Sequence, residues 1–66
     1  MTFQEAVKVV EDYAAGFGIA RGLLLDGLQL IRDDLAIEDE DVPLMVSQKE
    51  VTAYHIVCRE MRKLFI

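Results

Sequence analysis

Residues 2–18 read TFQEAVKVVEDYAAGFG and contain the clearest structural signal in the chain. Apolar side chains return at every third or fourth position, which places them on one face of an α-helix. These residues are Phe3, Ala6, Val7, Val10, Tyr13, Ala14 and Phe17. Thr2 and Glu5 have the spacing of a capping box, in which each side chain satisfies a backbone amide that the first turn leaves unpaired. We therefore predict a first helix over residues 3–15.

A second apolar stripe predicts a helix over residues 19–35. Its members are Ala20, Leu24, Leu28, Ile31 and Leu35, and it is widened on one side by Ile19, Leu23 and Leu30. Gly22 and Gly27 each cost a helix about 1 kcal/mol relative to alanine, so packing has to compensate for them. The alternative is a later start, with Asp26 as the N-cap and Gln29 completing a capping box. We favour the longer helix because the apolar stripe begins before Asp26.

A third helix is predicted over residues 47–64. Ser47 and Glu50 form a second capping box, and Val46 and Val51 occupy the positions of a hydrophobic staple. The buried stripe is expected to contain Ala53, Tyr54, Val57, Met61, Leu64 and Phe65. Three amphipathic helices predict an all-α fold of one domain over residues 1–66. This is either a small three-helix bundle or an open helical fold completed by dimerisation.

The connection between the second and third helices begins with an acidic run, EDED at residues 38–41. Pro43 follows and excludes helical geometry at the residue before it. Val42, Leu44 and Met45 are apolar, so we expect this connection to lie across the core.

Composition and charge exclude several classes of protein. Hydrophobic residues make up 53% of the 66 residues, more than a chain of this length easily buries by itself. The chain has no apolar run long enough for a membrane span and no signal-peptide layout at its start. Cys58 is the only cysteine, which excludes an internal disulfide and fits a reducing compartment. These features predict a soluble, cytoplasmic protein, and the net charge of −5 disfavours nucleic-acid binding.

The second helix is the predicted association surface. Its apolar residues cover more than half of its circumference, and two neighbouring helices can each cover only part of it. We expect Ile19, Leu23 and Leu30 to lie at the uncovered edge of a homodimer interface, with Leu25 beyond the other edge of the stripe. Burying an exposed leucine contributes roughly 1.5–3 kcal/mol, so two copies of such an edge can hold a dimer.

Residues 13–19, YAAGFGI, resemble the turn of the helix-turn-helix family. The matching positions are Ala14, Phe17, Gly18 and Ile19. Gly16 and Gly18 also favour a left-handed end to the first helix. The resemblance implies a DNA-associated regulator, but the following residues include Leu23, Leu25 and Asp26, which are poor readers of a DNA groove. The sequence therefore favours an ordinary corner between two helices.

The third helix also carries a basic stripe. Its residues are His55, Arg59, Arg62 and Lys63. Cations near a helix C-terminus are stabilised by the macrodipole, by about 0.3–1 kcal/mol each, and the acidic residues offer counter-charges. An ion-paired or solvated face is the favoured interpretation, and contact with an anion or an acidic partner is the alternative.

Catalytic and metal-binding patterns are missing from the sequence. His55 and Cys58 are neighbours on a helix, but two ligands complete a zinc site only if a second copy supplies two more. The acidic run lacks the spacing of a calcium loop. We expect no enzyme activity, cofactor, metal or small-molecule substrate. The predicted function is a small, acidic protein-protein interaction module, acting as a homo-oligomeric regulator, inhibitor or accessory subunit. The alternative is a helix-turn-helix-like DNA-associated regulator that uses the basic stripe.

Overall fold

The computed structural model describes residues 1–20, 22–36 and 46–64. In this part of the chain the elements are α1 (Phe3–Ala15), α2 (Leu24–Leu35) and α3 (Gln48–Leu64). The prediction of an all-α, three-helix fold is confirmed. The predictions made for the connection at residues 37–45 and for Phe65 lie outside the described residues, as does Arg21 within the predicted second helix.

The helix α1 has the predicted bounds. Thr2 is its N-cap, and the Thr2 hydroxyl accepts a hydrogen bond from the Glu5 amide at 3.2 Å. The Glu5 carboxylate accepts one in return from the Thr2 amide at 3.4 Å, which confirms the capping box. At the other end Gly16 is right-handed, with φ −62°, and the left-handed conformation occurs at Gly18, with φ 84°. The left-handed end predicted for both glycines is therefore wrong for Gly16.

The helix α2 begins later than predicted. A start at Ile19 is wrong, because the first helical residue is Leu24 and Leu23 is the N-cap. The alternative with Asp26 as N-cap is wrong as well, and Leu23 makes no side-chain capping bond. Gly22 has φ 91°, a conformation that a right-handed helix does not contain. The apolar residues before Gly22 therefore belong to the connection and not to the helix.

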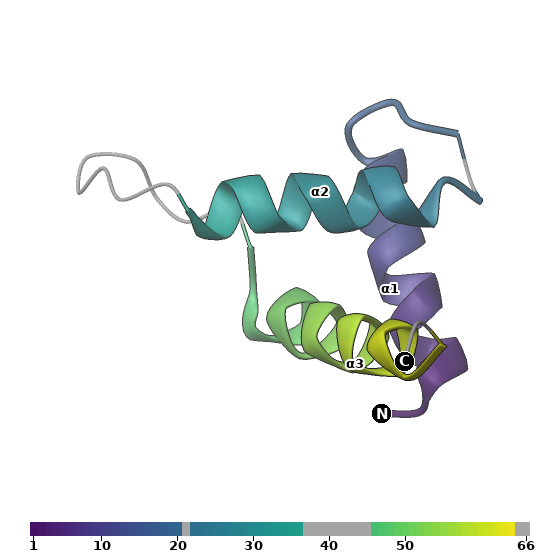
Figure 1. The fold of residues 1–66 in the computed structure, drawn as a ribbon. Coiled ribbons are helices and arrows are strands. Elements are labelled where there is room, and N and C mark those ends of the chain that lie inside the picture. The colour runs from purple at the N-terminus through teal and green to yellow at the C-terminus, as the bar shows by residue number, and fades with distance from the viewer. Residues whose placement is uncertain (21, 37–45, 65–66) are drawn as a thin grey trace.

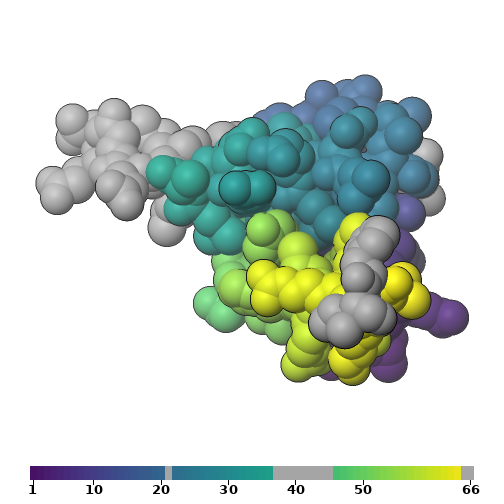
Figure 2. All heavy atoms as spheres, in the orientation of Figure 1, coloured from purple at the N-terminus to yellow at the C-terminus, as the bar shows by residue number. Residues whose placement is uncertain are grey.

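The helix α1 is central to the fold. Both α2 and α3 pack mainly against α1 and make few contacts with each other. Figure 1 shows α2 crossing α1, with α3 lying below α2. The buried core cluster consists of Ala6, Val10, Leu28, Ile31, Val46, Ala53 and Val57. Because α2 and α3 meet only slightly, a surface groove remains along their boundary, where the two helices adjoin in Figure 2.

The crossing of α1 and α2 depends on Gly27. A Cβ atom at this position would lie 2.8 Å from Val10 Cγ1 and 2.9 Å from the Val10 carbonyl oxygen. Glycine therefore allows the two helices to approach each other closely. This contact is the packing that was expected to compensate for a glycine inside α2.

The start of α3 agrees with the sequence pattern. Val46 is buried, and Val51 packs against the core. The Ser47 hydroxyl donates a hydrogen bond to the Glu50 carboxylate, and the Val51 amide donates to the Ser47 carbonyl at 3.1 Å. The other end differs from the prediction: Leu64 is 81% exposed, because the last turn of α3 extends beyond the buried residues.

None of the helices in the described residues has the length and apolar character needed to cross a membrane.

Candidate functional site

The predicted association residues divide into two groups. Leu23 and Leu25 are 47% and 66% exposed, whereas Ile19 and Leu30 are partly buried. A surface hollow of about 270 Å³ lies beside the two exposed leucines. Its described lining residues are Gly22, Leu23, Leu24, Leu25 and Asp26. Leu23, the N-cap of α2, and Leu25, in its first turn, therefore line the same hollow, and we call these two residues the apolar edge.

The exposure of the apolar edge follows from helix geometry. Successive residues on a helix are separated by about 100°, so three consecutive leucines cannot all face one core. Leu24 packs against the core cluster, so the next helical residue, Leu25, is turned away from it, and Leu23 is the N-cap, whose backbone is not helical.

Other large apolar side chains are also exposed in the described residues. They are Met1, Phe3, Phe17, Leu35 and Leu64. Phe3, Phe17, Leu35 and Leu64 had been predicted to lie on the apolar stripes of their helices, and their exposure corrects that prediction. The ring of Phe17 packs against Tyr13, with 5.1 Å between centroids, and the Tyr13 hydroxyl donates a hydrogen bond to Asp34 on α2. Helical periodicity identified the apolar side of each helix but not how far the partner helix covers it.

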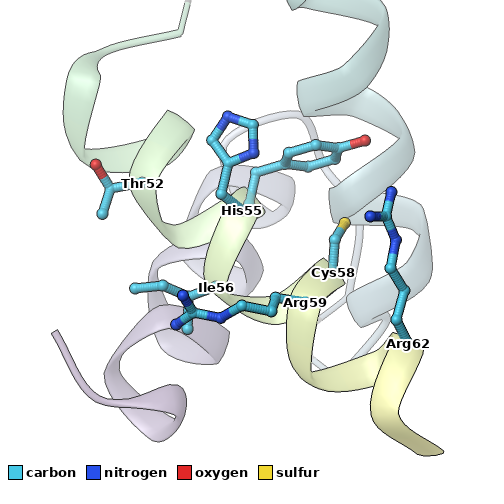
Figure 3. Close-up of a pocket in the computed structure, with 7 residues that line it drawn as sticks. Thr52, His55, Ile56, Cys58, Arg59 and Arg62 are labelled. Carbon is cyan, nitrogen blue, oxygen red and sulfur yellow. The ribbon is translucent and has the colours of Figure 1, made fainter.

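Three residues of the predicted basic stripe line one surface pocket. This pocket lies along α3 and has a volume of about 540 Å³ (Figure 3). Its described lining residues are Thr52, Tyr54, His55, Ile56, Cys58, Arg59 and Arg62. Lys63 does not line it, and the Lys63 ammonium is 3.2 Å from a Glu60 carboxylate oxygen. The stripe therefore consists of a pocket with three basic residues and one separate ion pair.

The arginines of the pocket have no ion-pair partner among the described residues. Lys63 and Glu60 form an ion pair, but neither Arg59 nor Arg62 forms one with any described carboxylate. Within the described part of the chain, the expected ion-paired face is therefore found only at Lys63. No described carboxylate pairs with the guanidinium groups of Arg59 and Arg62.

A third arginine approaches the same surface from α2. A groove of about 270 Å³ runs between α2 and α3, and its described lining residues are Leu25, Leu28, Gln29, Arg32, Tyr54 and Cys58. Tyr54 and Cys58 line both this groove and the pocket on α3. Arg32 was not among the predicted site residues, because periodicity within one helix cannot identify a residue contributed by another.

Tyr54 lines both hollows, together with arginines from α2 and α3. Burial raises the pKa of Tyr54, the neighbouring Cys58 raises it further, and Arg32 and Arg62 lower it. The His55 ring meets the Tyr54 ring edge-on, with 5.7 Å between centroids. Arg32 and Arg62, from two different helices, therefore act on the same phenol.

The side chains at this surface have the chemistry of an anion-binding site. Guanidinium groups bind carboxylates and phosphates through paired, charge-assisted hydrogen bonds. Within the described ranges, no group of three His, Cys, Asp or Glu residues is placed to hold a metal ion. Cys58 is half-buried and His55 is exposed.

The geometry between α1 and α2 differs from a helix-turn-helix. Residues 16–23 connect the two helices, whereas the turn of that motif has about three or four residues. The resemblance at residues 13–19 therefore does not extend to the length of the turn.

No known protein family, curated protein or solved structure matches this chain. Its function is therefore inferred from the fold, the apolar edge and the basic surface.

Proposed function

We propose that this chain is a small protein-interaction module that self-associates through the apolar edge of α2 and acts as a regulator, inhibitor or accessory subunit. The observation that supports the proposal is the adjacent exposure of Leu23 and Leu25 beside a hollow. Each leucine that a partner covers contributes roughly 1.5–3 kcal/mol. A two-fold symmetric dimer buries the same patch on both copies, so it doubles the number of covered leucines.

The proposal is tested by light scattering on a sizing column at tens of micromolar protein. The wild-type chain is expected to be a dimer, and Leu25→Glu is expected to be a monomer, because an unpaired carboxylate is costly to bury. Since Leu25 is 66% exposed, the variant should keep its helical circular dichroism. Leu64→Glu makes the same chemical change at an exposed position on α3 and should remain a dimer. A monomeric wild type, or equal loss of association in both variants, would contradict the proposal.

A DNA-associated regulator is the second candidate. The absence of described ion-pair partners for Arg59 and Arg62 favours it, and the net charge of −5 opposes it. A gel shift with duplex DNA at about 100 mM salt that disappears in an Arg59→Ala, Arg62→Ala variant would support this function.

A further inference from the structure

We propose that the surface shared by α2 and α3 is a binding site for an acidic segment of a partner protein. Its cations are Arg32 on α2 and Arg59 and Arg62 on α3, and the ring of Tyr54 provides an apolar contact. This site goes beyond the proposed self-association. It adjoins the apolar edge, because Leu25 belongs to that edge and also lines the groove between α2 and α3. The three arginines do not belong to the apolar edge, so their substitution tests this site separately.

The groove between α2 and α3 and the pocket on α3 adjoin each other, because they share two lining residues. The groove between α2 and α3 contains Arg32, the pocket on α3 contains Arg59 and Arg62, and Tyr54 and Cys58 line both. A ligand lying over Tyr54 can therefore reach cations from both helices.

The positions of the arginine side chains favour an extended ligand. Figure 3 shows the side chains of Arg59 and Arg62 extending in different directions from α3, with the Arg62 guanidinium group beside Cys58. Arg32 adds a cation from the neighbouring helix. A segment with several carboxylates can pair with these separated groups one by one, whereas a single small anion can engage only one of them.

The charge of the surface also calls for an acidic partner. The whole chain has 12 acidic and 7 basic residues, yet none of the three arginines has an ion-pair partner among the described residues. Arg32 and Arg62 each lie in the last turn of their helix, where the macrodipole stabilises a cation. The macrodipole explains why a cation is tolerated there but leaves its hydrogen-bond donors available for carboxylates.

The lining favours a peptide over a nucleic acid. The pocket on α3 includes Ile56 and the ring of Tyr54, on which apolar side chains of a peptide can rest. Its volume of about 540 Å³ is within the usual range for ligand pockets in proteins. The net charge of −5 repels a long polyphosphate more strongly than a short acidic segment, because the segment carries fewer negative charges.

The test uses a short dye-labelled peptide made of glutamate, leucine and glycine, and measures fluorescence anisotropy at low salt. The 66-residue chain is expected to bind it more tightly than the same peptide with lysine in place of glutamate. Arg32→Gln and Arg62→Gln should each weaken binding by about two- to fivefold, the range of an exposed ion pair. Lys49→Gln removes the same charge from an exposed position at the other end of α3 and should leave affinity unchanged.

Three outcomes would overturn the proposal. They are equal affinity for the glutamate and lysine peptides, equal effects of the arginine variants and Lys49→Gln, and tighter binding of a duplex DNA than of the acidic peptide. All three substituted residues are exposed, so circular dichroism should show an unchanged fold. A sizing column separates the two proposals, because Arg62→Gln should weaken peptide binding without changing the oligomeric state.

Discussion

Gly27 of α2 lies so close to Val10 of α1 that no side chain fits between the two helices. A Cβ atom added to Gly27 would meet both the Val10 side chain and the Val10 carbonyl oxygen, and it would also lie 3.3 Å from the Ala14 Cβ. Because the carbonyl oxygen belongs to the backbone of α1, the crowding is relieved only if the helices move apart. The position of α2 on α1 therefore depends on this glycine.

We predict that Gly27→Ala lowers the free energy of unfolding by about 1–3 kcal/mol, the usual cost of overpacking a core. In an isolated helix the same change is stabilising by about 1 kcal/mol, so the two effects have opposite signs. Urea denaturation measures the difference. A more stable Gly27→Ala variant would show that α2 does not cross α1 at this residue.

Gly18 provides the matched control for Gly27. Nothing lies within 4 Å of a Cβ at Gly18, but φ is 84° there, so alanine should cost about 1–2 kcal/mol through backbone strain alone. Asparagine tolerates this conformation better than alanine. Asn should therefore be the milder substitution at Gly18 and the more harmful one at Gly27, where its larger side chain has no space.

Ser47→Ala should lower the free energy of unfolding by about 1 kcal/mol, the cost of losing the N-cap that the spacing of Ser47 and Glu50 predicts. The Ser47 hydroxyl donates to the Glu50 carboxylate, and the Val51 amide donates to the Ser47 carbonyl. Ser47→Asn retains a capping oxygen and an N–H donor for Glu50, so it should remain close to wild type. If the urea midpoint and the slope of Ser47→Ala both match the wild type, the cap contributes nothing to stability.

The capping box of α1 predicts a dependence of stability on pH. The side-chain hydrogen bond from Thr2, followed by the bond from its backbone amide, holds the pKa of Glu5 below its ordinary value of 4.5. The ionised carboxylate therefore contributes its full stabilisation above that value, and the contribution is lost as the pH falls through the pKa of the folded state.

The test follows the thermal unfolding midpoint between about pH 6 and about pH 3 in the wild type and in Glu5→Gln. Glutamine can still complete a capping box but does not titrate. The midpoint of Glu5→Gln should therefore fall less steeply with decreasing pH. Identical slopes would mean that the Thr2–Glu5 pair does not stabilise the folded state.

Ile31 and Leu25 should respond very differently to truncation, although both are large aliphatic residues of α2. Ile31 is fully buried in the core cluster, so Ile31→Ala should cost about 2–5 kcal/mol. Leu25 is mostly exposed, so Leu25→Ala should change the stability of the monomer by less than about 0.5 kcal/mol. The comparison is made by urea denaturation at protein concentrations low enough to suppress association. Similar costs at the two positions would show that Leu25 is part of the core.

The sequence pattern predicted the helix starts that depend on interactions between residues within one turn. The capping box at Thr2 and Glu5 satisfies amides within one turn, so both the start of α1 and its apolar face could be predicted from adjacent residues. The start of α3 could be predicted for the same reason, because Ser47 and Glu50 act on each other across one turn.

The start of α2 could not be predicted in this way. An apolar stripe continues through the connection before it, and the left-handed backbone at Gly18 and Gly22 interrupts the helical geometry there. Glycine can adopt either sign of φ, so its presence in the sequence does not determine which one occurs.

The sequence by itself determined that this chain forms amphipathic helices and has more apolar side chains than it easily buries. Only the tertiary structure decided which of those side chains remain exposed and which cations share a surface. Leu24 packs against the core cluster, while Leu25 is mostly exposed. Arg32 and Arg62 both lower the pKa of Tyr54, although they are on different helices. The physical reason is that burial and charge clustering depend on where helices cross, and this crossing is set by the contact of Gly27 with Val10 across two helices.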